Sequence, residues 1–144
     1  TSIPQDGVDL VLKASARHAT SNSPISFVYF NGVTTGYTRI KLEGTGTGVS
    51  TNSYSTAQFL PVEPFSYTSN TLGNSEVTIS NYTSSNSKSI SSDGVNENNA
   101  SDAAQILHAA SYSGTEAITS LTITPAAGNF AQYSSASLYK ITAD

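Results

Sequence analysis

Residues 8–17 have the sequence Val-Asp-Leu-Val-Leu-Lys-Ala-Ser-Ala-Arg, in which every even-numbered residue from Val8 to Ala16 is apolar. The charged side chains of Lys13 and Arg17 fall at odd-numbered positions. Because successive side chains of a β-strand point to opposite faces, this alternation predicts a half-buried strand. In this prediction the even-numbered residues face the protein interior, and Arg17 faces outward.

Short segments of the same kind follow along the chain, roughly one every 8–15 residues. Ser, Asn, Gly or Pro bound each of them. This spacing predicts an all-β protein, an antiparallel β-sandwich of about eight short strands that forms a single domain over residues 1–144. Further strands are expected at residues 25–30, 37–43, 76–80, 88–91, 118–124 and 135–141, with an edge strand or loop at the proline-containing segment 59–65.

The segment 37–43 alternates in the same way as the first strand. We expect Thr38, Ile40 and Leu42 to face inward, and Tyr37, Arg39, Lys41 and Glu43 to face outward. The glycines at every second position of residues 44–48 superficially resemble a phosphate-binding loop. Because the GK[ST] ending and the following helix are missing, a β-turn connection is the favoured interpretation.

The segment 101–110 permits two interpretations. Ser101 is a suitable N-cap, and an acidic residue and several good helix formers follow it, which favours a helix. Ala104, Ile106 and His108 also alternate with Gln105 and Leu107, which favours a strand. Helix and strand both remain open on the residues alone.

The composition excludes several classes of function. Charged residues make up 11% of the chain, the net charge is −4, and 25 serines and 18 threonines give 43 hydroxyl side chains among 144 residues. The six Lys and Arg residues are scattered, so nucleic acid is not expected as a partner. The absence of cysteine excludes disulfides, thiolate zinc sites and a cysteine nucleophile.

No apolar run approaches the ~18 residues of a membrane span, and no basic stretch followed by an apolar one marks a signal peptide. No membrane insertion is therefore expected. Thr1 is compatible with a removed initiator methionine or with a fragment boundary.

The common catalytic motifs are absent. No G-x-S-x-G sequence occurs, and only His18 and His108 are available as histidine bases. We expect His18 to lie on the surface beside Arg17 and His108 to be a hydrogen-bonded interior or interface side chain. A non-enzymatic protein without a cofactor is the resulting prediction.

Residues 93–102 crowd three acidic side chains with three asparagines. Asp93, Glu97 and Asp102 are candidate calcium ligands, because oxygen-rich loops hold this ion. The spacing does not match the D-x-[DN]-x-[DN]-G calcium loop, so an ordered turn without metal is the favoured interpretation.

Tyrosine is the remaining signal, with eight tyrosines and no tryptophan. Tyr combines a large apolar face with a hydroxyl and is favoured at protein interfaces and where sugars stack. Four tyrosines lie beside polar turns and are candidate contacts for a partner protein or a glycan: Tyr54, Tyr67, Tyr82 and Tyr112.

The second half of the chain contains the motif Asn-Tyr-Thr-Ser-Ser-Asn at 81–86, followed in order by the segments 117–123, 128–130 and 137–141. With these motifs, residues 76–141 resemble a β-rich domain of virion proteins of tailed bacteriophages. Many members of that group have a tryptophan where this chain has Tyr112-Ser113-Gly114.

This resemblance implies a jelly-roll-like β-sandwich on the virion surface, in the capsid or a tail appendage, without cofactor or catalysis. It also implies a homo-oligomer, a trimer, that contacts other virion proteins such as the capsid shell. The expected function is a structural one, as a capsid decoration (cement) or spike module. The alternative is a receptor-binding fibre head or a carbohydrate-binding module that recognises cell-surface glycans. The segment 101–110 is expected to be a strand on this basis.

Overall fold

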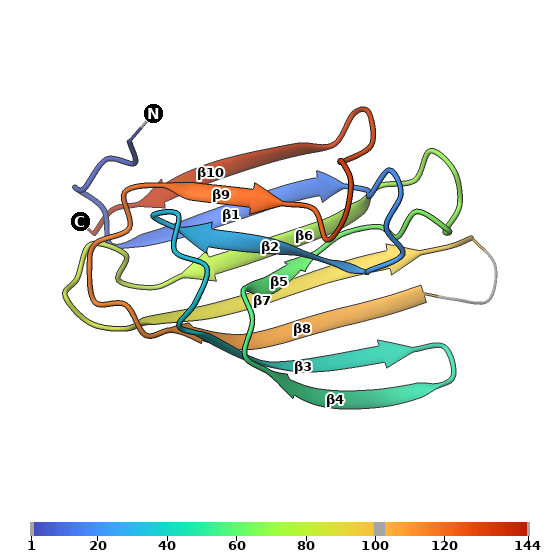
Figure 1. Cartoon of the computed structure of the whole chain (residues 1–144), viewed down its shortest axis with the longest axis horizontal. Helices are drawn as coiled ribbons and strands as arrows, with labels where there is room; N and C mark the ends of the chain where they lie inside the picture. Colours follow the sequence, from blue (N-terminus) through green and yellow to red (C-terminus); the bar gives the residue numbers. More distant parts are fainter. Residues whose placement is uncertain (1, 100–102, 144) are drawn as a thin grey trace.

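The computed structural model describes residues 2–99 and 103–143, which form ten strands in two antiparallel sheets of seven and three strands (Figure 1). The described residues contain no helix, and so none that is long and apolar enough to cross a membrane. The prediction of an all-β sandwich is confirmed, although the chain has ten strands and not about eight.

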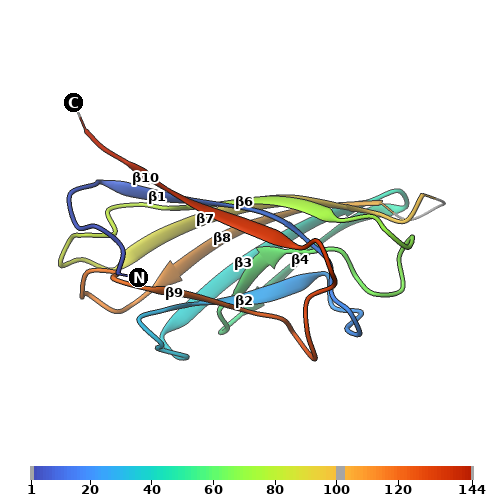
Figure 2. The same cartoon turned by 90° about the horizontal axis from the view of Figure 1, so that it is seen from above.

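The large sheet has the strand order β10-β1-β6-β7-β8-β3-β4, and the small sheet has the order β5-β2-β9. Figure 2 shows the small sheet lying against one face of the large sheet. The strands of the large sheet are β1 (Asp9–Ala16), β3 (Tyr37–Thr45), β4 (Gly48–Tyr54), β6 (Gly73–Ile79), β7 (Lys88–Glu97), β8 (Ala103–Tyr112) and β10 (Ser135–Ile141). Those of the small sheet are β2 (Ile25–Phe30), β5 (Gln58–Pro61) and β9 (Leu121–Thr124).

Three strand pairs are nested within one another along the chain. β1 pairs with β10, β2 with β9, and β3 with β8, all antiparallel. The first and third pairs lie in the large sheet and the second lies in the small sheet. Nested pairs that alternate between two sheets are a jelly-roll feature, here with sheets of unequal size.

The two sheets share one hydrophobic core, built on the alternation of β1. Leu10, Leu12, Ala14 and Ala16 are buried, as the sequence predicts. They pack in one cluster with side chains from both sheets, which include Val28, Phe30, Phe59, Val77, Ile79 and Ile90.

The predicted orientation of β3 is wrong. Tyr37 and Arg39 are buried, whereas Ile40 and Leu42 are 56% and 39% exposed. The cause is Tyr37, whose ring stacks on Tyr112 at 4.7 Å between centroids and whose hydroxyl accepts a 2.8 Å hydrogen bond from the Phe30 backbone N–H. Because side chains alternate along a strand, this one anchored ring fixes the orientation of every residue in β3.

β4 is a strand that sequence patterning missed. All seven of its residues are exposed, so it has no apolar alternation. It forms because residues 44–48 make a tight hairpin in which Thr45 pairs with Gly48, which confirms the turn predicted there. β8 settles the ambiguous segment from Ala103 onward as a strand, with Ala104, Ile106 and His108 buried; Ser101 and Asp102 lie outside the described residues.

The small sheet approaches the large one most closely through β5, which lies over β6 and β7. Gly94 of β7 makes this approach possible, because a Cβ at that position meets the Pro61 Cβ at 2.5 Å and the Ser75 Cβ at 3.0 Å. A Cβ at Gly44 of β3, by contrast, has no neighbouring atom within 4 Å.

Replacing Gly94 by alanine therefore forces the two sheets apart, and we expect Gly94→Ala to lower the free energy of unfolding by about 1–3 kcal/mol. Gly44→Ala is the matched control in the same sheet and should cost nothing, since alanine is better than glycine in an open strand. Urea denaturation measures both. Equal stabilities for the two variants would contradict the packing of β5 on β7.

Candidate functional site

The outer face of the large sheet, the face turned away from the small sheet, carries exposed apolar side chains. Leu42 pairs with Leu107 across β3 and β8, and Ile40 pairs with Ala109 one row along. Leu107 is 41% exposed, comparable with Leu42. We call these four residues the apolar patch. Solvated sheet faces are ordinarily polar, so this apolar cluster is a candidate contact surface.

The charges of the outer face begin at the edge of the patch, where Asp93 pairs with Leu107. The row that begins with Leu42 and Leu107 continues across the sheet through Asp93, Glu76 and Lys13. Lys13 and Glu76 form an ion pair with 3.0 Å between Nζ and Oε2. The outer face is thus divided into an uncharged half over β3 and β8 and a charged half over β7, β6 and β1.

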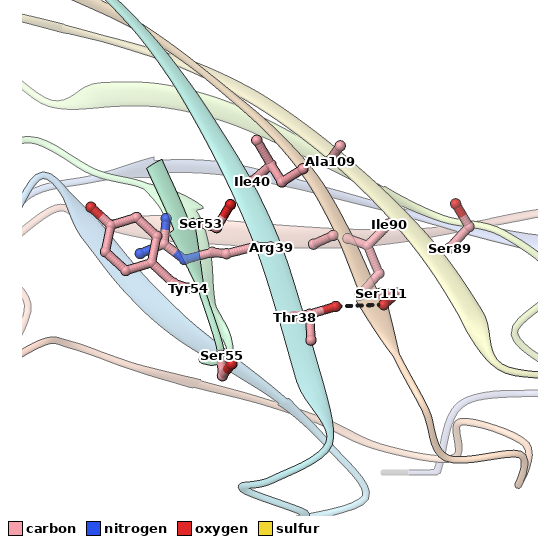
Figure 3. A pocket seen from close by; sticks show the side chains of 11 residues that line it. Thr38, Arg39, Ile40, Ser53, Tyr54, Ser55, Ser89, Ile90, Ala109 and Ser111 are labelled. Atoms are coloured by element: carbon pink, nitrogen blue, oxygen red, sulfur yellow. Dashed lines mark hydrogen bonds between the residues drawn. The ribbon is translucent and has the colours of Figure 1, made fainter. Parts of the chain in front are cut away.

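A shallow depression adjoins the apolar patch (Figure 3). It has a volume of about 590 Å³ and is lined mostly by small side chains, among them Ser53, Ser89 and Ala109 beside Ile40. The hydroxyls of Thr38 and Ser111 are hydrogen-bonded across it at 2.9 Å. The patch and the depression together form a continuous surface that offers both apolar and hydroxyl contacts, and Arg39 is the one charged residue of the lining of the depression.

Of the four predicted tyrosines, Tyr54 alone belongs to the lining of the depression. It pairs with Arg39 across β4 and β3, and the Arg39 guanidinium packs over its ring at 4.1 Å (Figure 3). Tyr67 is half-buried, and its carbonyl accepts a 2.7 Å hydrogen bond from Arg17 Nη2. These two rings lie on different elements and share no site.

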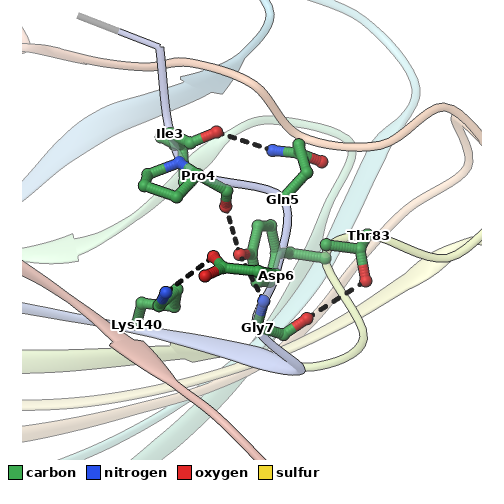
Figure 4. A network of polar contacts seen from close by, with 8 residues as sticks. Ile3, Pro4, Gln5, Asp6, Gly7, Thr83 and Lys140 are labelled. Atoms are coloured by element: carbon green, nitrogen blue, oxygen red, sulfur yellow. Dashed lines mark hydrogen bonds and ion pairs between the residues drawn. The ribbon is translucent and has the colours of Figure 1, made fainter.

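Tyr82 is fully buried, so its prediction as an exposed contact is wrong. Its hydroxyl accepts a 3.2 Å hydrogen bond from the Gly7 N–H and donates one to the Pro4 carbonyl (Figure 4). The nearby ion pair between Lys140 Nζ and Asp6 Oδ1, at 2.6 Å, also ties down the N-terminal segment. Tyr82 therefore holds that segment against the end of the sandwich.

The prediction is also wrong for Tyr112, which is buried in the aromatic cluster with Tyr37, Phe30 and Phe59. Its hydroxyl donates a 2.6 Å hydrogen bond to Glu116 Oε1. Burial and this carboxylate raise the pKa of the Tyr112 hydroxyl. Polar neighbours in the sequence did not reveal that the ring turns inward.

The acidic segment is not a loop over its first half. β7 extends to Glu97, so the turn expected from residue 93 is wrong for 93–97. The side chains of Asp93 and Glu97 both lie on the outer face. Four residues of strand separate their Cα atoms by about 13 Å. Asp102 lies outside the described residues, and within the described ranges no three acidic or histidine side chains gather as a metal site.

His108 lies in a buried polar network, as expected. Its Nε2 accepts a 3.0 Å hydrogen bond from Arg39 Nη1, and its Nδ1 lies 2.9 Å from the Ser92 hydroxyl. Because arginine only donates, Nδ1 carries the ring proton and donates to Ser92. In this tautomer His108 is unable to accept a proton from Ser92.

Burial, and then the charges of Arg39 and Lys41, lower the pKa of His108 to about 3. The ring is therefore neutral near pH 7, and it accepts a hydrogen bond from the positively charged Arg39 without adding a second charge.

His18 is fully buried and not on the surface, and Arg17 beside it is buried as well, so both expectations are wrong. The His18 Nδ1 donates to the Ser23 carbonyl at 2.8 Å, and Nε2 accepts from the Ser26 hydroxyl at 2.8 Å and from the Ala126 N–H at 3.2 Å. Burial lowers the pKa of His18. Because Ser26 is also fully buried, a substrate has no access to this Ser–His pair.

Comparisons with protein-family models, with curated proteins and with solved structures found no match to this chain. The functional argument therefore rests on the chain's own residues.

The buried His108 makes stability dependent on pH. An unfolded chain protonates this histidine near pH 6.5, whereas the folded state does so only near pH 3. The unfolded state thus binds more protons between these values, and the free energy of unfolding falls as pH drops through this window, by up to about 1.4 kcal/mol per pH unit. The lowered pKa of His18 acts in the same direction, and the pKa of Glu63, raised by burial, acts in the opposite one.

We expect His108→Gln, which keeps an acceptor for Arg39, to show a shallower decline in stability between pH 6.5 and pH 4 than the parent. Urea denaturation at successive pH values measures both slopes. Parallel slopes in parent and variant would contradict the neutral assignment of His108.

Proposed function

We propose that the protein is a non-enzymatic structural protein of a bacteriophage particle surface that acts as a homo-oligomer through the apolar patch. The role that we infer is a capsid decoration or spike module. The resemblance of residues 76–141 to phage virion proteins supports the setting. The observation that carries the proposal is the orientation of β3, which exposes Ile40 and Leu42.

The orientation of β3 is unfavourable for a chain on its own, because it covers two charged side chains and exposes two apolar ones. Lys41 and Glu43 face the inner side, where they form an ion pair with 2.5 Å between Nζ and Oε2 and are largely covered. Ile40 and Leu42, whose burial is favourable, face water instead. A partner that covers the outer face removes this apolar surface from water.

The occupant of the patch that we propose is a second copy of this chain. The four patch residues carry no charge, and Asp93, which pairs with Leu107, lies at the rim of the patch, so a copy can cover these four residues without burying an unpaired charge. Homo-oligomers with closed symmetry are the commonest assemblies of soluble proteins. The number of copies implied by the resemblance is three, in which case the patch of one chain meets a different surface of the next.

Charge within the patch should break this assembly. We expect Leu42→Lys or Leu107→Lys to convert the oligomer into a species of 15.0 kDa, the mass of one chain. Thr47→Lys, at an exposed residue of the β3–β4 turn, is the matched control and should leave the mass unchanged. Light scattering coupled to gel filtration measures the mass. A parent protein that is already monomeric would overturn self-association through the patch.

The place on the particle is tested separately by immunogold electron microscopy of phage particles from the source culture, with antibody against the purified protein. We expect gold over the capsid for a decoration role. Gold confined to the tail tip would contradict decoration in favour of a fibre head, and unlabelled particles would contradict the virion assignment.

A further inference from the structure

A second surface lies at the end of the sandwich where β1 ends and β6 and β10 begin (Figure 1). There the segments 65–72 and 131–133 face one another across a groove of about 510 Å³. We propose that this groove, here called the end groove, binds a neutral saccharide by stacking a pyranose ring on Tyr133, with Phe65 as a second contact on the facing wall. The inference goes beyond the proposed structural function and does not depend on it.

Two exposed aromatic rings line the end groove. Tyr133 is 81% exposed, the highest fraction of any large apolar side chain among residues 2–99 and 103–143. Phe65 on the facing wall is 52% exposed. Aromatic rings that lie in water beside polar groups suit ligands with one apolar face and many hydroxyls, and the C–H face of a pyranose has this character.

The backbone at Tyr133 gives independent support. The Ser134 N–H donates a 3.2 Å hydrogen bond to the Ala131 carbonyl, which closes a four-residue turn with Tyr133 third. Tyr133 has a φ of 70°, where this turn favours glycine or asparagine and an aromatic residue is strained. Because the ring is exposed, core packing does not compensate for this strain. Strained residues of this kind cluster at binding sites.

The facing wall shows the ordinary solution to the same geometry. There the Thr71 N–H donates a 3.3 Å hydrogen bond to the Thr68 carbonyl, and Asn70 has a φ of 67° at the third position. Asparagine is a residue that this conformation tolerates. Tyr133 holds the corresponding position of the turn at residues 131–134. The backbone geometry of that turn does not explain why a tyrosine stands there.

Arg17 holds both walls of the end groove in place. Its guanidinium donates to the carbonyls of Phe65, Tyr67 and Thr68, the last at 2.6 Å from Nη1. Its own carbonyl accepts a 2.8 Å hydrogen bond from the Ala131 N–H. One buried residue therefore fixes both segments before any ligand arrives, which reduces the entropy lost on binding.

The polar groups of the groove favour an uncharged ligand. Ser69, Asn70 and Gln132 supply a hydroxyl and two amides, which both donate and accept hydrogen bonds. Arg17 is the one charged side chain of the lining, and its guanidinium is turned toward the backbone carbonyls. Neutral hydroxyls match this set better than a phosphate or a carboxylate does.

The test is a titration of ¹⁵N-labelled full-length protein with the methyl glycosides of glucose, galactose, mannose and N-acetylglucosamine, followed by amide chemical shifts. We expect at least one of the four to move the amides of residues 65–72 and 131–134 at millimolar concentration, the usual range for a single small site. If none of the four glycosides moves these amides, the proposal is overturned.

Tyr133→Gly separates binding from folding. Glycine suits the φ of 70°, so this variant should keep a melting temperature at or above that of the parent, while its affinity for the glycoside falls at least tenfold. Phe65→Ala should weaken binding as well. Tyr139→Ala removes an exposed tyrosine of the outer face and should leave the affinity unchanged. Unchanged binding in Tyr133→Gly would overturn the assignment, whatever the oligomeric state.

Discussion

A sheet of three strands is too narrow to cover a sheet of seven, and the rest of this structure follows from that mismatch. The small sheet lies over the part of the large one from β10 to β7, with β5 over β6 and β7, and β3 and β4 extend beyond it (Figure 1). Under the cover the inner face is aliphatic and aromatic. Toward β3 it becomes polar, with Arg39, His108 and Ser92 joined in one hydrogen-bonded network. Apolar residues of β3 then lie on the opposite, outer face.

The sequence predicted the parts of the fold that depend on local alternation. The inward face of β1 and the hairpin at residues 44–48 are readable from the residues. The strand character of β8 is expected only from the resemblance, because the residues alone leave helix and strand open. The orientation of β3 is not readable from the sequence, because it depends on the packing of Tyr37 against Tyr112 and Phe30. Tyr112 is distant in sequence, and Phe30 belongs to the other sheet. The sequence does not predict β4 either, because an exposed edge strand of Val, Ser, Thr and Asn has no alternating pattern.

Site prediction from sequence failed for a related reason. Tyrosines beside polar turns are expected to be exposed, yet the rings of Tyr82 and Tyr112 turn inward and their hydroxyls donate hydrogen bonds to the Pro4 carbonyl and to Glu116. The most exposed tyrosine, Tyr133, lies in a turn whose sequence Ala-Gln-Tyr-Ser has no Gly, Asn or Pro to announce it. Its positive φ is a property of the folded backbone. The apolar patch was likewise hidden, because Leu42 and Leu107 are adjacent only through strand register.

Hydroxyl-radical footprinting with mass spectrometry tests the central claim, that the outer face is covered in the working protein. The account predicts that Ile40, Leu42 and Leu107 are oxidised far less than their exposures of 56%, 39% and 41% in the single chain imply. Tyr133 and Phe65, on the separate end groove, should react in full and serve as internal references. Oxidation of Leu42 and Leu107 in proportion to these exposures would contradict the account.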